Sequence, residues 1–251
     1  MSARPRTSQA QVGDGAGPAT AVGTTTTSAS PAAPEAETLD AAGVLAELER
    51  RFAPERIGLA CSFQKEETVV LDLLHRSGAL QRGVRVFALD TEVLFSETYE
   101  LWRSEEQRLG VTIEARRGIG LAEQAARHGE ALWERDPTAC CGLRKVAPLD
   151  QVLGELDAWI TGVRRDQSPT RATAPKLGWD AAHGLWKANP LADWDNARVW
   201  AHITAGELPY NPLHDEGYAS IGCTHCTRPG SDRDGRWADR AKTECGLHGD
   251  G

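Results

Sequence analysis

Short apolar runs alternate along the chain with longer segments in which apolar residues recur at helical spacing. Alternation of this kind indicates an α/β fold, with a mostly parallel, twisted sheet flanked by helices. The apolar runs predict β-strands at residues 57–61, 84–89, 111–115 and 158–163. The helical spacing predicts helices at residues 39–52, 67–75, 96–109 and 121–128, and another from the region of Cys140 to Leu156.

The N-terminal segment differs in composition from the rest. Residues 1–36 consist mainly of Ala, Thr, Ser, Gly and Pro, which bury too little surface to offset the entropy lost on folding. We therefore expect a disordered extension at residues 1–36 and the start of the folded domain at residue 37. After Arg165 the alternation weakens, apart from a helix expected between Asp193 and Ile203, and nothing marks a second domain.

The chain is acidic, with a formal charge of −8 at pH 7. This charge argues against a general nucleic-acid or membrane-surface binder, because proteins that bind these anionic partners usually carry an excess of basic residues. The sequence has no apolar run of about 18 residues and no secretory signal, so we expect a cytoplasmic protein. In that reducing compartment, the six cysteines are expected to be metal ligands or reactive thiols before disulfides.

Polar residues follow several predicted strands at the point where each strand ends. Ser62, Asp90 and the pair Arg164-Arg165 each come directly after a strand. In open parallel sheets, ligands bind beyond the carboxyl ends of the strands. The loop from Ser62 to Glu66 could present backbone N–H groups to a phosphate. It contains no glycine, however, and an ordinary strand-to-helix turn has the same pattern.

Four cysteines form two pairs, the adjacent Cys140 and Cys141 and the C-x-x-C of Cys223 and Cys226. Four thiolates suit either zinc or an iron–sulfur cluster. Adjacent residues rarely reach a single zinc ion, whereas a cubane offers a separate iron to each thiolate, so the spacing favours a [4Fe-4S] cluster. Buried structural cysteines are a third interpretation, which the combination of two pairs disfavours.

Basic residues accompany these features although the chain is acidic overall. Arg144 and Lys145 follow the adjacent cysteines, and Arg228, Arg233 and Arg236 follow the C-x-x-C. Their placement predicts a local cationic lining that selects a polyanionic small molecule through bidentate arginine contacts.

Cys245 stands apart in a polar segment near the C-terminus. Lys242 and His248 would favour its thiolate, the form that attacks, whereas Glu244 would oppose it. The residues alone leave two interpretations open, a nucleophile and an incidental tail cysteine. Cys61 is expected to be a buried strand residue without a chemical role.

Three segments combine into a specific pattern: Cys-Cys-Gly-Leu-Arg-Lys at 140–145, Cys-Thr-His-Cys-Thr-Arg-Pro at 223–229, and Glu-Cys-Gly-Leu-His at 244–248. With weaker matches at 89–91, 95–99, 162–168, 189–191 and 210–214, the chain resembles the assimilatory adenylyl-sulfate reductases. The resemblance extends from Leu39 to the C-terminus.

The resemblance implies an adenine-nucleotide alpha-hydrolase-like fold, the PP-loop fold, in a nucleotide-binding reductase domain at residues 37–236. It implies that Cys245, on a mobile tail at residues 237–251, attacks the sulfur of adenosine 5′-phosphosulfate, and that thioredoxin then releases sulfite. It also implies a [4Fe-4S] cluster on Cys140, Cys141, Cys223 and Cys226. Substrate contacts are implied at Ser62, Phe63, Leu89, Lys145, Arg164, Arg165, Arg233, Arg236 and His248.

The loop at 62–67 departs from the family pattern, with Ser-Phe-Gln-Lys-Glu-Glu where many relatives carry Ser-Phe-Ser-Gly-Ala-Glu. Reductases of the 3′-phosphorylated substrate share the fold and the tail cysteine but typically lack the cluster cysteines, so the intact set favours the unphosphorylated substrate. An ATP-using pyrophosphatase or tRNA-thiolating enzyme would need a Ser-Gly-Gly pattern that this loop lacks. A zinc-stabilised binding module is a further alternative. The sequence leaves the oligomeric state open, including a homo-oligomer.

Overall fold

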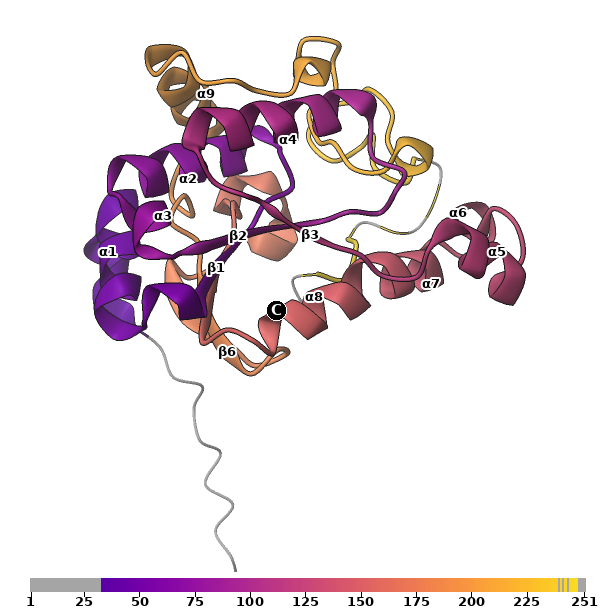
Figure 1. Cartoon of the computed structure of the whole chain (residues 1–251). Helices are drawn as coiled ribbons and strands as arrows, with labels where there is room; N and C mark the ends of the chain where they lie inside the picture. The colour runs from indigo at the N-terminus through magenta and orange to yellow at the C-terminus, as the bar shows by residue number, and fades with distance from the viewer. Residues whose placement is uncertain (1–32, 239, 241, 243, 248–251) are drawn as a thin grey trace, which may run out of the picture.

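A six-stranded sheet forms the centre of the molecule (Figure 1). The computed structural model describes residues 33–238, 240, 242 and 244–247. The strands are β1 (Ile57–Ala60), β2 (Arg85–Leu89), β3 (Glu114–Arg116), β4 (Ala158–Ile160), β5 (Leu177–Asp180) and β6 (Leu185–Ala188), in the order β3-β2-β1-β4-β6-β5. All neighbouring strands pair in parallel except β5, which runs antiparallel to β6 at one edge. The predicted α/β fold with a mostly parallel sheet is confirmed.

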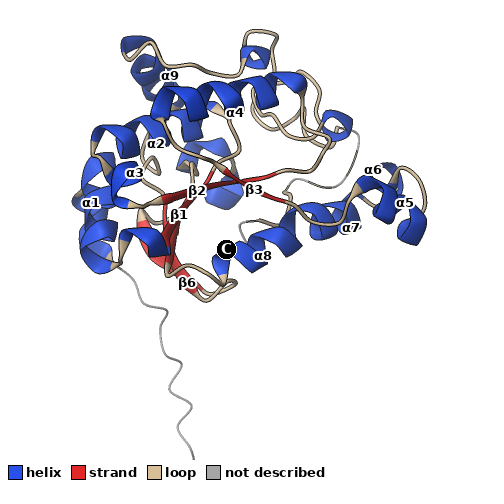
Figure 2. Ribbon diagram, in the orientation of Figure 1, coloured by secondary structure: helices blue, strands red, loops and turns tan. Residues whose placement is uncertain are grey.

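Helices cover both faces of the sheet and enclose an apolar core on each (Figure 2). The larger core contains residues of α1, α2, α4 and α9, and the smaller core joins α8 to Phe87 and Trp159 of the sheet. The helices are α1 (Ala41–Arg51), α2 (Lys65–Arg76), α3 (Ala79–Arg82), α4 (Ser96–Leu109), α5 (Leu121–His128), α6 (Leu132–Arg135), α7 (Pro137–Cys141), α8 (Ala147–Leu153) and α9 (Asn196–Ala205).

Hydrophobic periodicity locates most of these elements but misses the last two strands. β5 and β6 have four residues each, and such short runs give little periodicity in a segment rich in Trp and Gly. The helix predicted from the region of Cys140 to Leu156 is found, although it ends at Leu153 and contains a π-helical turn, Gly142–Val146, between α7 and α8. The strand predicted at 111–115 begins only at Glu114.

The described chain begins at Ala33, ahead of the predicted domain start at residue 37. Pro34–Thr38 forms a 3-10 helix, and Ala33 and Ala36 are buried in the larger core. Residues 1–32 lie outside the described residues, so the predicted extension is not tested there. Among the described helices, none is both long enough and apolar enough to cross a membrane.

Candidate active site

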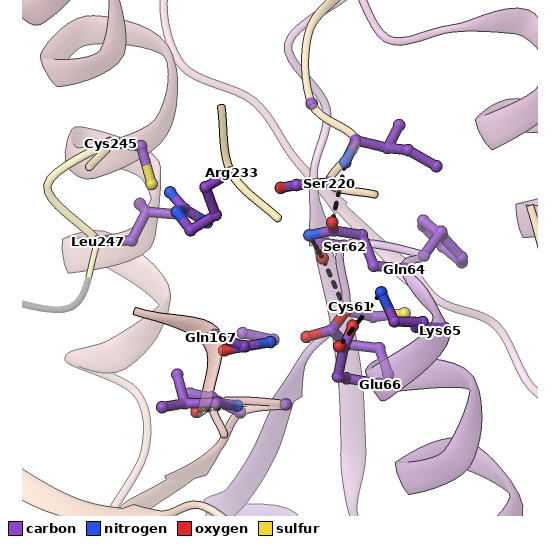
Figure 3. A pocket seen from close by; sticks show the side chains of 18 of the residues that line it. Cys61, Ser62, Gln64, Lys65, Glu66, Gln167, Ser220, Arg233, Cys245 and Leu247 are labelled. Carbon is purple, nitrogen blue, oxygen red and sulfur yellow. Dashed lines mark hydrogen bonds and ion pairs between the residues drawn. The ribbon is translucent and has the colours of Figure 1, made fainter. Parts of the chain in front are cut away.

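A cavity of about 410 Å³ lies at the carboxyl ends of β1, β2 and β4, and we call it the main cavity (Figure 3). The sequence predicts a ligand site at this edge, because side chains that follow neighbouring parallel strands meet there. The structure brings most of the predicted residues together around it. The predicted residues that line the main cavity are Ser62, Phe63, Leu89, Lys145, Arg164, Arg233, Arg236 and Cys245.

The loop after β1 forms one wall of the main cavity. Phe63 is buried against Trp102, with ring centroids 5.1 Å apart, and adopts a left-handed φ of 58° that is costly for a side chain of this size. Gln64 holds the loop to a distant segment, since its side-chain oxygen accepts from the Ile221 N–H at 2.9 Å. Lys65 donates to the Ala219 carbonyl at 3.2 Å. The two residues that replace Ser-Gly in the family pattern therefore tie the loop to the segment that precedes Cys223.

Two buried carboxylates at the start of α2 have opposite electrostatic environments. Burial alone would raise the pKa of Glu66, but Lys65 and Arg164 hold it below its usual value. The nearest Glu66 oxygen lies 3.0 Å from the Arg164 guanidinium. Burial and the neighbouring Glu66 charge raise the pKa of Glu67 to about 7, although Glu67 accepts a 2.8 Å hydrogen bond from the Ser62 hydroxyl. Arg164 also pairs with Asp166, so two carboxylates already neutralise this predicted phosphate contact.

The adjacent predicted contact, Arg165, points elsewhere. Its guanidinium pairs with Glu37 at 2.6 Å and donates to the Ala174 carbonyl at 2.9 Å. Arg165 is not among the residues that line the main cavity. The loop that follows supplies Arg171 instead, a residue that the sequence analysis did not select.

Lys145 enters the main cavity from the π-helical turn between α7 and α8. Burial alone would lower the pKa of Lys145, but the charges of Cys223, Cys245 and Cys141 raise it. The preceding residue, Arg144, is buried and donates to the Ile119 carbonyl at 2.9 Å. Arg144 therefore fixes the turn to a neighbouring loop, while Lys145 faces both the cavity and the cysteines.

The predicted metal ligands come from two segments, α7 with Cys140 and Cys141, and the 3-10 turn Thr224–Cys226 with Cys223 just before it. Burial and the charges of Cys141 and Cys223 raise the pKa of Cys140 to about 11. Burial opposes ionisation of Cys223 as well, but Lys145 and the Thr91 hydroxyl lower its pKa.

Cys140 therefore interacts electrostatically with Cys141, Cys223 and Cys226. In the described part of the chain, no three Cys, His, Asp or Glu side chains are arranged to hold a metal ion. The donor set fits a cluster better than a single ion, because a cluster does not require its thiolates to converge on one point.

Residues 244–247 of the C-terminal segment lie against the main cavity, with Cys245 and Leu247 in its lining (Figure 3). Glu244 forms ion pairs with Arg171 and Arg233, each at 3.0 Å. Leu247 packs against the smaller core. His248, a predicted substrate contact, lies outside the described residues.

Comparison with known families agrees with the motifs in this site. Residues 56–229 match the family described as the phosphoadenosine phosphosulfate reductase domain, which is more than half of the chain. The chain belongs to this family. The match includes both cysteine pairs and the loop after β1, whereas Arg233 and Cys245 lie beyond its end.

Members of the reductase family with curated names cover most of the chain. An adenosine 5′-phosphosulfate reductase from Salinibacter ruber is 50% identical over 182 residues, covering 70% of this chain and 72% of that protein. A protein of the same name from Bacillus mycoides is 44% identical over 220 residues, covering 85% of this chain and 92% of that protein.

Solved structures give the same fold. The phosphoadenylyl-sulfate reductase from Candida auris, a phosphate complex, has a TM-score of 0.66 at 31% identity and covers 76% of this chain and 91% of its own. The FMN adenylyltransferase from Candida glabrata has a TM-score of 0.55 at 17% identity, covering 76% of this chain and 64% of its own, and supports the fold alone. The predicted PP-loop fold of this family member is therefore confirmed.

Sequence reasoning missed several residues that line the main cavity, notably Lys65, Glu67, Gln167 and Arg171. Arg171 follows a predicted strand by several residues, in a Pro- and Thr-rich loop that gives no periodic signal. The departure of the loop at 62–67 from the family pattern is a signal for Lys65, because it places Lys where the pattern has Gly.

Proposed function

We propose that this chain reduces adenosine 5′-phosphosulfate to sulfite and AMP in assimilatory sulfate reduction. The observation that carries the proposal is Cys245, which lies in the same cavity as the loop after β1 and Lys145. The names of the curated relatives support adenosine 5′-phosphosulfate as the substrate.

In the first step, the Cys245 thiolate attacks the sulfur of the phosphosulfate. A sulfur–sulfur bond forms and the bond between that sulfur and the bridging oxygen breaks, so that AMP leaves with the electron pair and Cys245 carries a sulfonate. Lys145, Arg233 and Arg236 line the cavity where the charged groups would lie and can stabilise the charge that develops on the leaving phosphate. The loop after β1 and the N-terminus of α2 would hold the nucleotide.

In the second step, we propose that a thioredoxin thiolate attacks the Cys245 sulfur and releases sulfite. The second thioredoxin thiol then attacks the mixed disulfide, which restores the Cys245 thiolate and leaves thioredoxin oxidised. The dithiol supplies both electrons. This exchange suits a reducing compartment, and all six cysteines are free thiols, so we propose a cytoplasmic location.

We further propose that Cys140, Cys141, Cys223 and Cys226 hold a [4Fe-4S] cluster. When bound, the cluster would contribute charge beside the main cavity and a crosslink between α7 and the C-x-x-C segment. Lys145 is influenced by both environments, because the charges of Cys223 and Cys245 both raise the pKa of its ammonium. Its role in our proposal is to hold the substrate anion between the cysteine ligands and the nucleophile.

A reductase of the 3′-phosphorylated substrate is the second candidate. The solved structure from Candida auris carries that name and is 31% identical, which favours this alternative. The two cysteine pairs favour the unphosphorylated substrate, because reductases of the 3′-phosphorylated substrate typically lack them. A nucleotide-binding protein stabilised by metal, without reductase chemistry, would use the same fold but would not need Cys245.

The test is anaerobic incubation of the purified full chain with adenosine 5′-phosphosulfate, without thioredoxin, followed by intact-mass analysis and peptide mapping. We expect a sulfonate on Cys245 and release of AMP, and neither in a Cys245→Ser variant. A parallel incubation uses the 3′-phosphorylated substrate. An adduct only with that compound would transfer the assignment to the second candidate, and no adduct with either would overturn the proposal.

A further inference from the structure

Glu244, the residue before Cys245, is held by two arginines of the main cavity. One Glu244 oxygen lies 3.0 Å from Arg171 and 3.0 Å from Arg233, and the other accepts from the Arg171 Nε at 3.3 Å. The side chains of Arg171, Arg233 and Glu244 are only 11%, 18% and 24% exposed. A carboxylate that two shielded guanidinium groups share is bound more firmly than one in an exposed ion pair.

A carboxylate between the two arginines is electrostatically favourable. Burial and the charge of Arg171 lower the pKa of Arg233 to about 10, while Glu244 acts in the opposite direction. Two guanidinium groups placed this close repel each other. One carboxylate that bridges them offsets that repulsion. Glu244 therefore stabilises the two arginines of the cavity wall and at the same time holds the segment that carries Cys245.

A second contact lies on the other side of Cys245. Leu247 packs against the smaller core, which contains Phe87 and Leu149. Between the two contacts, Gly246 adopts a left-handed φ of 85°, which turns the chain at the nucleophile. Cys245 therefore lies between the ionic contact of Glu244 and the apolar contact of Leu247. Arg171, Arg233 and Leu247 all line the main cavity.

We propose that Glu244 is a positioning residue, and that its ion pairs with Arg171 and Arg233 hold Cys245 in the main cavity. The effect of this docking on catalysis rests on the proposed function, but the docking itself can be measured without substrate. An ionic contact of this kind is reversible, which the second step requires, because the sulfonated cysteine must then become accessible to thioredoxin.

The first measurement is the rate at which iodoacetamide alkylates Cys245 in the purified, substrate-free full chain, resolved by peptide mapping. Glu244→Gln should accelerate alkylation by roughly tenfold, because the tail spends more time outside the cavity. Glu100→Gln, which changes an exposed carboxylate on α4, is the matched control and should leave the rate unchanged.

Arg171→Gln separates tail release from a simple charge effect. Removal of a nearby positive charge disfavours the Cys245 thiolate and by itself would slow alkylation. Loss of the ionic contact releases the tail and would accelerate it. We expect faster alkylation in Arg171→Gln, and a double variant that is no faster than Glu244→Gln alone, because Glu244→Gln already breaks the ion pair with Arg171. Slower alkylation in Arg171→Gln, or an unchanged rate in Glu244→Gln, would overturn the proposal.

A single-turnover measurement links the docking to the reaction. With adenosine 5′-phosphosulfate, Glu244→Gln should form the Cys245 sulfonate roughly tenfold more slowly, although its thiol reacts faster with iodoacetamide. A sulfonate rate equal to that of the wild type would contradict a positioning role. If the wild type forms no sulfonate while the alkylation rates change as expected, the docking stands and the proposed function fails.

Discussion

At the scale of single residues, the charge of Glu67 in the lining of the main cavity depends on pH near neutrality. Glu67 is a buried carboxyl beside Glu66, and burial together with that neighbouring charge raises its pKa to about 7. Near neutral pH, Glu67 is therefore partly protonated, in the first turn of α2, where Ser62 of the preceding loop donates to one of its oxygens. The wall that is expected to hold the nucleotide thus contains a group that ionises close to physiological pH.

We predict that Glu67 destabilises the fold as pH rises. Between its ordinary pKa of 4.5 and its folded value of about 7, the native state binds a proton that the unfolded state has released. The free energy of unfolding should therefore fall across this range, by up to ~3 kcal/mol for this group. Glu67→Gln cannot ionise and should be more stable than the wild type by ~2 kcal/mol at about pH 8.

Urea unfolding at about pH 5 and about pH 8 checks this prediction, with Glu100→Gln as the control. The difference in stability between Glu67→Gln and the wild type should be larger at the higher pH. If the two proteins differ by the same amount at both values, the buried carboxyl does not titrate in this range and the interpretation is wrong.

The pair Arg164 and Arg165 marks the limit of residue-level prediction. The sequence places both at the end of a strand, and motif resemblance selects both as substrate contacts. Arg164 has an extended backbone, in which successive side chains point to opposite sides. Arg164 therefore lines the main cavity while Arg165 pairs with Glu37 on another surface. The sequence identifies the strand end but not the direction of either side chain, which depends on the packing of the following loop.

At the scale of elements, the π-helical turn Gly142–Val146 sets the position of Lys145. The loop that includes Gly118 approaches the turn so closely that a Cβ at Gly118 would overlap the Leu143 carbonyl oxygen. Arg144 adds hydrogen bonds to the carbonyls of Ile119 and Thr91. Periodicity predicts a continuous helix here, because apolar spacing carries no information on one extra residue in a turn.

We predict opposite effects from two glycine substitutions around this turn. Gly118→Ala should destabilise the protein by ~2 kcal/mol and displace Lys145, because its new methyl group meets backbone that no side-chain rotation can move. Gly142→Ala is the matched control, since it has helical dihedral angles and open space around its Cβ position. Gly142→Ala should change stability by less than ~1 kcal/mol and in the favourable direction.

Unfolding midpoints in urea compare the two variants, and the rate of Cys245 sulfonation reports on Lys145. Gly118→Ala should lower both the midpoint and the rate. A Gly118→Ala protein as stable as Gly142→Ala would mean that the loop moves away without cost, and that the close approach does not fix the turn.

At the scale of the whole molecule, the segment before α1 contacts a part of the chain that lies far away in the sequence, around Arg165 and Lys176. Glu37 pairs with Arg165 at 2.6 Å and accepts from the Lys176 N–H at 2.8 Å, and Lys176 donates to the Leu39 carbonyl at 2.6 Å. These contacts tie the start of the domain to the loop that contains Arg171. Composition alone assigned residues 33–36 to a disordered extension, because short Ala and Pro segments reveal nothing of the surface that they contact.

We predict different effects from two N-terminal deletions. Deletion of residues 1–32 removes the segment whose composition predicts disorder, and it should leave the unfolding midpoint unchanged. A deletion that extends through Thr38 also removes buried Ala36 and the Glu37 contacts, and it should cost about 2 kcal/mol. In the full chain, Glu37→Gln should reproduce part of that loss, since burial alone would raise the pKa of Glu37 but Arg165 and Lys176 hold it below its usual value.

The same proteins test whether this segment supports the active site. Because Arg165 and Lys176 flank the loop of Arg171, loss of Glu37 should loosen that loop and weaken the ionic contact of Glu244. Alkylation of Cys245 should therefore be faster in Glu37→Gln and in the longer deletion, but not in the shorter one. Equal alkylation rates in all three, with the predicted loss of stability, would show that the N-terminal segment stabilises the sheet edge without reaching the nucleophile.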